Sequence, residues 1–381
     1  MSRTLARRAY RYRFYPTEEQ ASQLSRTFGC VRMVYNRALE ARTTVWNQEQ
    51  RRVTYADTSA LLTEWKASEE FGFLNEVSCV PLQQCLRHLQ AAFTNFFAKR
   101  TCFPRFKSRK RGTASAEYTR SAFRWRDGQL TLAKMAEPLD IRWSRHLPED
   151  VLPSTVTVSR DAAGRWHVSI LVETCVEHLP ASQGAVGVDV GLTSLVTLST
   201  GEKVLNLRHE QRDRARLTRA QRALAPKQKG SLNRAKARLA VARVHARIAD
   251  RRRDLLHQLS TRLLRENQTI VIEDLVVANM LHNQSLARAI SDAAWSQFRS
   301  MLEYKAQWYG RRVIVVDRWL PSSKTCSACG LVKGAMPLHI RIFECAGCGL
   351  VLDRDHNAAL NILAAGRAVA ACGDGVGPIR R

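Results

Sequence analysis

The stretch GAVGVDVGLTSLVTLSTG, residues 184 to 201, decides how this chain folds. Apolar Val186 and Val188 lead into one acid, Asp189, and a second apolar run, Leu195 to Leu198, follows a glycine-containing turn. This pattern predicts two paired β-strands, the second returning beside the first. Because an isolated carboxylate is costly to bury among apolar strands, Asp189 is expected to be paired, protonated or metal-bound.

Two other segments repeat this arrangement. QTIVIEDL places Glu273 and Asp274 at the end of a predicted strand, and GLVLDRDHNAALNI places Asp353 and Asp355 where a strand turns into a helix. Acids from three distant segments are therefore expected to meet at one edge of a sheet. Taken alone, each acid is better explained as a cap of the helix that follows. The three together favour a site for a hard cation such as Mg²⁺, which takes carboxylate oxygens and assists phosphodiester cleavage in pairs.

Four cysteines have the spacing of a metal site. They form two C-x-x-C pairs with fifteen residues between them, Cys326 with Cys329 and Cys345 with Cys348. A glycine follows each pair, as tight metal-binding turns allow. Four thiolates leave no open position on a metal, so the spacing predicts one structural Zn²⁺. Four unrelated core cysteines, or a redox pair, would not explain this repeated spacing.

Composition indicates the class of partner. The chain of 381 residues has 60 Lys plus Arg against 34 Asp plus Glu, a net charge of +26, which predicts a polyanionic partner. The excess is uneven, with 18 Lys or Arg against 4 Asp or Glu between Arg208 and Arg265. A solvated charge run does not need such an imbalance, so we expect this segment to be a helical hairpin whose basic side contacts phosphates.

No apolar run is long enough to predict a signal peptide or a membrane span, so we expect a cytoplasmic protein, in the prokaryotic cytosol or nucleoid, with no membrane partner. Six scattered cysteines are then expected to be buried thiols without disulfides. They are Cys30, Cys79, Cys85, Cys102, Cys175 and Cys372.

The N-terminal half alternates between strands and helices. A strand ending at Tyr15 precedes a predicted helix that starts with a capping box at Thr17 and Gln20. Later hairpins are predicted about Asp127-Gly128 and Ala163-Gly164. Because the N-terminal strand has no local partner, we expect it to join these later strands in a β-barrel interrupted by a helical insertion. The loop FPRFKSRKR, residues 103 to 111, is equally compatible with a linker and a nucleic-acid contact.

These motifs resemble one known family over nearly the whole chain. GVDVGL, IVIEDL and LDRDHNAALNI, with PSSKTCSACG between the last two, are similar to the three split RuvC motifs and the zinc ribbon of TnpB proteins. The N-terminal TFGCVRMVYNRAL and the stretch from LQQCLRHLQAAFTNFF to FPRFKSRK also resemble that family. TnpB proteins are transposon-encoded, RNA-guided nucleases similar to the type V CRISPR effectors.

The resemblance implies a multidomain α/β and β-barrel protein. We expect a wedge-like β-barrel over residues 1–15 and 112–180, a helical recognition insertion over 16–111, an RNase H-like (RuvC) nuclease domain over 184–319 and 351–365, a zinc ribbon over 320–350 and a flexible tail over 366–381. The family pattern assigns two catalytic Mg²⁺ ions to Asp189, Glu273 and Asp355, and ranks Asp274 and Asp353 lower.

The implied activity is Mg-dependent, RNA-guided cleavage of DNA. A guide RNA from the transposon end would pair with double-stranded target DNA beside a short motif that the protein reads, and a monomer is favoured. Four residues match positions where the family reads DNA: Tyr55, Ser59, Gln83 and Gln84. Alternatively, Tyr55 is core and both glutamines are solvated.

Two other functions remain open. An unguided transposase or resolvase-type nuclease would use the same acids, but it would not explain the large basic, non-catalytic half. A nuclease-inactive, RNA-guided repressor would be expected to lack one of the acids, whereas all three are present.

Overall fold

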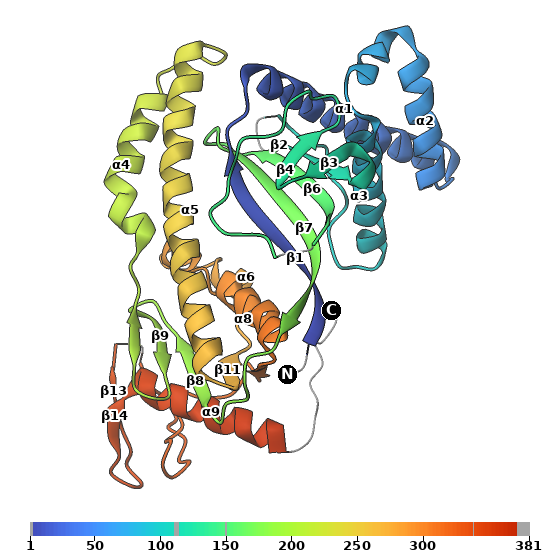
Figure 1. The fold of residues 1–381 in the computed structure, drawn as a ribbon. Coiled ribbons are helices and arrows are strands. Elements are labelled where there is room, and N and C mark those ends of the chain that lie inside the picture. Colours follow the sequence, from blue (N-terminus) through green and yellow to red (C-terminus); the bar gives the residue numbers. More distant parts are fainter. Residues whose placement is uncertain (1–2, 110–113, 149–150, 338, 372–381) are drawn as a thin grey trace. The chain divides into compact units, whose positions relative to one another are not determined.

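The computed structural model describes residues 3–109, 114–148, 151–337 and 339–371 (Figure 1). The chain forms two compact units. One spans Leu5–Cys175, and the other comprises the chain from Val176 onward together with its start, up to Thr4. Within the described ranges, no helix is both long enough and apolar enough to span a membrane.

The first unit contains a five-stranded sheet with the order β2-β6-β7-β1-β5. Its strands are β1 (Arg3–Phe14), β2 (Ala114–Thr119), β5 (Ile141–Arg142), β6 (Pro153–Arg160) and β7 (Trp166–Glu177). The N-terminal strand thus joins the later strands, as predicted. The predicted barrel is wrong: in the described part of the chain no ladder joins β2 to β5. β5 has only two residues, so it offers too few backbone groups to continue the pairing and close the sheet.

Both predicted hairpins are confirmed. β3 (Phe123–Arg126) and β4 (Gln129–Leu132) pair around Asp127 and Gly128, both of which have positive φ, at 50° and 73°. Two such residues make a turn whose twist matches that of the strands. The second hairpin joins β6 to β7, with Arg160 opposite Trp166 around the Ala163-Gly164 turn.

Helices between β1 and β2 form the predicted insertion. They are α1 (Glu18–Glu49), α2 (Tyr55–Ala67), the 3-10 segment η1 (Glu69–Glu76) and α3 (Cys79–Phe97). The capping box at Thr17 and Gln20 is present at the start of α1. A second capping box, Thr54 with Asp57, starts α2. The buried faces of α1 and α3 share one hydrophobic core with the sheet.

The second unit contains a sheet with the order β10-β9-β8-β11-β12. Its strands are β8 (Ala185–Val190), β9 (Ser194–Leu198), β10 (Lys203–Leu205), β11 (Thr269–Glu273) and β12 (Arg312–Val316). β8 and β9 pair antiparallel, as residues 184 to 201 predict, whereas β11 runs parallel to both β8 and β12. Parallel neighbours place their carboxyl ends at the same edge of the sheet.

Helices surround this sheet. The basic segment forms the predicted helical hairpin, α4 (His209–Leu224) and α5 (Leu232–Glu266), and Ser231 caps α5. The short α6 (Val277–Met280) and α7 (Ala287–Ala293) precede α8 (Trp295–Tyr309), which packs against α5. The strands β13 (Ile342–Glu344) and β14 (Val351–Asp353) pair just before α9 (Arg354–Ala371).

Two predictions need correction. The nuclease segment does not end at residue 365: α9 continues to Ala371, so residues 366–371 of the predicted tail are helical, and residues 372–381 lie outside the described residues. Among the scattered cysteines, Cys30 and Cys85 are buried, but Cys79, Cys102 and Cys175 are exposed. Cys372 also lies outside the described residues, and none of the other five forms a disulfide.

Candidate catalytic and metal sites

Two of the three predicted acids lie on neighbouring parallel strands. Asp189 is the penultimate residue of β8 and Glu273 is the last residue of β11. Val188 pairs with Ile272 in the ladder, so the two acids follow the same paired position and lie at the same end of the sheet.

The third acid reaches this end of the sheet on α9. Asp355 lies in the first turn of that helix, which packs against β8. The approach is very close at Gly187, where a Cβ would stand 2.2 Å from the carbonyl oxygen of Ala359. Glycine at position 187 is therefore what lets α9 lie directly on the strand that holds Asp189.

The acids influence one another electrostatically. Burial, together with the negative charges of Glu273 and Asp355, raises the pKa of Asp189 to about 8. Burial also raises the pKa of Glu273. Among the described residues, only the four cysteines bring three or more ligand atoms within 4.8 Å of one another, so the three carboxylates do not all lie within that distance of each other. All three acids are partly buried, and such a group is a suitable donor set for a cation.

The two acids ranked lower have structural partners. Asp353 pairs with Lys203 at 2.7 Å and accepts hydrogen bonds from the backbone N–H groups of Asp355 and His356, so it caps α9. Asp274 lies between Arg299, at 2.7 Å, and Arg318. These contacts give Asp274 and Asp353 structural roles beside the candidate site.

Sequence reasoning missed the groups that hold Glu273. The Ser322 hydroxyl donates a hydrogen bond of 2.6 Å to Glu273 Oε1, and Ser322 is only 7% exposed. The backbone of this segment is held from α9: Asn361 Nδ2 donates to the carbonyl oxygens of Ser322 and Thr325, at 2.8 and 2.7 Å. Asn357 bonds the same segment through the carbonyl oxygen of Thr325, at 2.7 Å. Two asparagines one turn apart, next to Asp355, were the available sequence signal.

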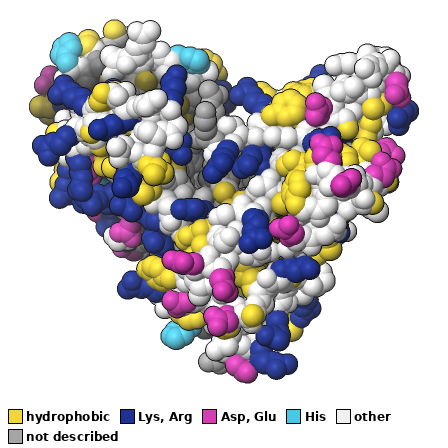
Figure 2. All heavy atoms as spheres, turned by 90° about the horizontal axis from the view of Figure 1, so that it is seen from above, with side chains coloured by type: hydrophobic (Ala, Val, Ile, Leu, Met, Phe, Trp, Pro, Cys, Tyr) yellow, Lys and Arg dark blue, Asp and Glu magenta, His cyan; other side chains and the backbone are white. Residues whose placement is uncertain are grey.

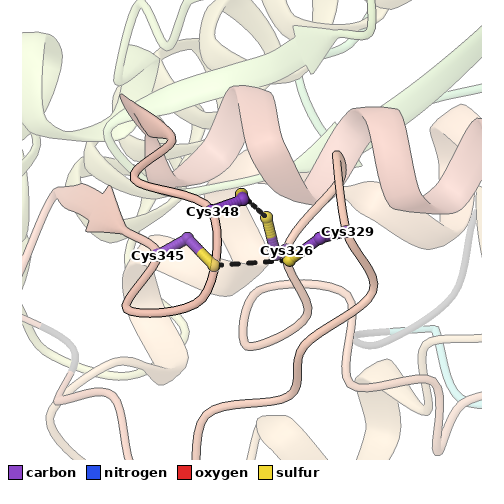
Figure 3. Close-up of side chains that lie close together, drawn as sticks. All are labelled: Cys326, Cys329, Cys345 and Cys348. Carbon is purple, nitrogen blue, oxygen red and sulfur yellow. Dashed lines mark hydrogen bonds between the residues drawn. The ribbon is translucent and has the colours of Figure 1, made fainter.

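The four predicted zinc ligands come together (Figure 3). The sulfur atoms of Cys326 and Cys348 are 3.6 Å apart, and those of Cys329 and Cys345 are 3.5 Å apart. A Zn–S bond of about 2.3 Å in a tetrahedron requires sulfurs about 3.8 Å apart, so the cluster fits a structural Zn²⁺.

The two halves of the cluster are built alike. Gly330 N–H donates to the carbonyl oxygen of Cys326, and Gly349 N–H to that of Cys345, with φ of 78° and 75° at the two glycines. Only glycine adopts this conformation at little cost. The backbone N–H of Cys348 helps to lower the pKa of the Cys345 thiol to about 6, which favours the thiolate that a metal binds.

The four candidate DNA-reading residues differ in exposure. Tyr55 and Ser59 lie on α2 and are half-buried, and Gln83 on α3 is exposed. Gln84, also on α3, is buried, at 8% exposure. α3 packs against α1, α2 and β2, so its buried face includes Gln84 as well as Leu82, Leu86 and Leu89.

The α4–α5 hairpin retains a large excess of positive charge. Its acids are mostly neutralised within it: Asp213 pairs with Arg251 at 2.8 Å and Glu210 with Arg214 at 2.6 Å. Figure 2 shows Lys and Arg side chains gathered densely on the left of the face seen from above, the side on which Figure 1 draws α4 and α5.

Three family models match this chain. They are described as "Probable transposase" (OrfB, IS605) over residues 167–284, "Cas12f1-like, TNB domain" over residues 295–362 and "Helix-turn-helix domain" over residues 1–51. In this structure the segment matched by the helix-turn-helix model contains one strand, β1, and one continuous helix, α1.

Individual relatives match over almost the full length. A protein of Streptomyces pristinaespiralis named "Putative RNA-guided DNA endonuclease" is 68% identical over 98% of this chain and 93% of its own length. The similarly named InsQ protein of Escherichia coli is 34% identical over 96% of this chain and 94% of its own length.

Among solved structures, the fold is similar to Cas12f1 in its complex with guide RNA and target DNA. The TM-score is 0.57 at 14% identity, covering 91% of this chain and 83% of that chain. More distant viral relatives are named TnpB-like proteins. Since full-length relatives and the OrfB model agree, the chain belongs to the TnpB family, the OrfB proteins of IS605-type elements.

Proposed function

We propose that this protein is an RNA-guided DNA endonuclease whose catalytic acids are Asp189, Glu273 and Asp355. The single observation that supports it most is the gathering of these acids, from β8, β11 and α9, at one end of the second unit's sheet in a TnpB chain. The sheet has two antiparallel pairs, β10–β9 and β9–β8, followed by the parallel strands β11 and β12, and this order supports an RNase H-like (RuvC) nuclease domain.

The carboxylates fit a hard divalent cation. Three acids from separate segments, two of them with raised pKa values, form an anionic group that a cation would neutralise. Mg²⁺ held by these oxygens would supply an activated water and stabilisation of the leaving 3′ oxygen. Ser322 keeps one oxygen of Glu273 hydrogen-bonded, which restricts the rotation of this carboxylate and leaves the other oxygen available to a cation.

The remaining domains are assigned by the same proposal. The helices over residues 16–111 and the sheet around them would contact the target-adjacent motif, and the basic hairpin would contact a guide RNA and its duplex with target DNA. Tyr55, Ser59, Gln83 and Gln84 are the proposed motif readers. A screen of randomised flanking sequence tests this role: Gln83→Ala should alter the preferred flank, whereas a change in rate alone would make Gln83 a positioning residue.

The catalytic assignment is tested by three single variants. Asp189→Ala, Glu273→Ala and Asp355→Ala should each cut below about a tenth of wild type while retaining nucleic-acid binding, because metal ligands act as a unit and binding depends on the basic surface. Glu344→Gln, which changes an exposed acid on β13, is the matched control. Cutting above that level would remove the residue in question from the site.

Guidance is tested by removing RNA. RNA that copurifies with the protein is sequenced, and its variable segment is then replaced by one that matches a chosen plasmid. With Mg²⁺, the RNA-free protein should cut no defined site, and the reprogrammed complex should cut beside the required flank. Cutting of one defined sequence without RNA would favour the unguided transposase or resolvase. Guide-dependent binding without cutting would favour the repressor.

A further inference from the structure

A cavity away from the acids and the cysteine cluster has only cationic side chains among its charged lining residues. It has a volume of about 1200 Å³ and lies within the first unit, between α1, β2, β6 and the loop of residues 103–109. Its cationic lining residues are Arg26, Arg32, Arg105, Lys107, Arg109 and Arg160, and no Asp or Glu lines it. Such a cavity attracts a polyanion through field focusing.

The loop that forms one wall is held in place. Pro104 is buried, and Phe103 packs edge-on against Phe93 and Phe96 with ring centroids 5.5 and 5.3 Å apart. Further along, Asn36 of α1 exchanges two hydrogen bonds with the backbone of Lys107, at 2.8 and 3.0 Å. The wall is therefore built before any ligand arrives.

Held at both ends, this loop nevertheless leaves an aromatic ring in solvent. Phe106 lies between the two anchored positions, lines the cavity and is 60% exposed. Among the described residues, Arg32, Arg105 and Arg109 form no ion pair. Exposed aromatic faces beside unpaired cations are the arrangement that binds single-stranded nucleic acid, in which bases stack on the ring and phosphates meet the cations.

We infer that this cavity binds a single-stranded nucleic-acid segment, with a base stacked on Phe106 and phosphates on Arg32, Arg105 and Arg109. A duplex fits less well, because its bases are stacked on one another and offer no free face to the ring. The identity of the bound strand rests on the proposed function. The strand is either an unpaired part of the guide RNA or a DNA strand separated from its partner.

The test uses RNA-free, full-length protein and two labelled probes of about 12 nucleotides, oligo(U) RNA and oligo(dT) DNA. Phe106→Leu should weaken binding of one probe roughly 5- to 150-fold by fluorescence anisotropy. Phe73→Leu, at another exposed phenylalanine outside the cavity, is the control. Loss with RNA alone assigns the cavity to the guide, and loss with DNA alone assigns it to the target.

A second measurement concerns the charges. Arg105→Gln with Arg109→Gln should flatten the dependence of log K on log salt by about 1.4, which is about 0.7 for each phosphate contact to a single strand. Arg124→Gln with Arg126→Gln removes the same charge from exposed positions on β3 and should change the slope less. If the variants at 105, 106 and 109 behave like their controls with both probes, the inference is overturned. Guided plasmid cutting by wild type is measured separately, so failure of the proposed function would be recognised independently.

Discussion

At the residue scale, the position of Glu273 depends on one hydroxyl group. Burial raises the pKa of this carboxyl, and the hydrogen bond from Ser322 opposes that effect by stabilising the charged form. Ser322 neither belongs to the acidic motifs nor ligates zinc, yet it joins the segment before the zinc site to a proposed catalytic acid. It is therefore a positioning residue.

We predict that Ser322→Ala lowers cutting roughly 10-fold or more while zinc content and guide binding stay at wild-type levels. The lost hydrogen bond, to a charged acceptor, is worth about 1.5–3 kcal/mol, and Glu273 would lose its fixed orientation. Ser322→Thr keeps the hydroxyl and should restore much of the rate. The neighbouring Ser323→Ala is the control; an equal loss in both alanine variants would make the effect one of general packing.

A second residue-scale prediction concerns pH. His167 on β7 is 9% exposed, and burial, with the positive charge of Arg11, lowers its pKa from 6.5 to about 4. The unfolded chain therefore binds a proton between these values and the folded chain does not, so stability falls as pH drops from 6.5 toward 4, by up to roughly 3 kcal/mol.

His167→Gln should reduce this acid sensitivity. Urea midpoints measured at pH 7 and pH 5 should differ less for His167→Gln than for wild type, whereas His146→Gln, at an exposed position, should behave as wild type. If the two midpoints differ as much in His167→Gln as in wild type, other groups cause the loss of stability at low pH.

At the scale of the element, α9 unites the candidate site. It carries Asp355 in its first turn, holds the segment over residues 322–327 through Asn357 and Asn361, and lies against β8 at Gly187. One helix thus positions acids from three segments. The distance between α9 and the sheet therefore determines how these acids are placed relative to one another.

We predict that Gly187→Ala destabilises the second unit by roughly 3 kcal/mol and abolishes cutting, because the added methyl group would overlap the carbonyl oxygen of Ala359 and push α9 away. Gly29→Ala is the contrasting change: a Cβ there meets nothing within 4 Å on α1, so it should stabilise that helix by about 0.5–1 kcal/mol. Thermal unfolding of both variants measures the effects. A Gly187→Ala protein with wild-type stability would show that the helix is free to shift.

At the scale of the whole molecule, the zinc cluster belongs to the second unit, and its effect should be confined there. Cys326 follows the segment that holds Glu273, and Ser327 N–H donates to Asn357 on α9. Structural zinc sites contribute directly to folding free energy. Loss of the metal should therefore loosen the catalytic end of the sheet.

We predict that each chain binds one Zn²⁺. Removal of the zinc by a chelator should increase the rate of hydrogen exchange more over residues 269–273 and 322–363 than over residues 5–175. Cys345→Ser should reproduce this pattern, whereas Cys79→Ser, at an exposed cysteine, should not. Metal analysis and exchange mapped to peptides measure both effects. A zinc-free preparation with full cutting activity would contradict the structural role.

The sequence by itself determined the elements whose signals are local. Short apolar segments predicted β8 and β9, a capping box predicted the start of α1, and the C-x-x-C spacing predicted the zinc cluster, because each of these rests on neighbours along the chain. The family motifs also pointed to the TnpB family, to which the full-length relatives assign the chain.

Only the tertiary structure decided the features that depend on distant packing. The open sheet follows from a β5 too short to continue pairing, the burial of Gln84 from three elements that surround α3, and the hold on Glu273 from Ser322, 49 positions away. The structure also gives Asp353 two contacts that the sequence does not specify, an ion pair with Lys203 and hydrogen bonds from the first N–H groups of α9. Burial and hydrogen bonding depend on contacts between segments that are distant in the sequence, and local sequence patterns do not specify those contacts.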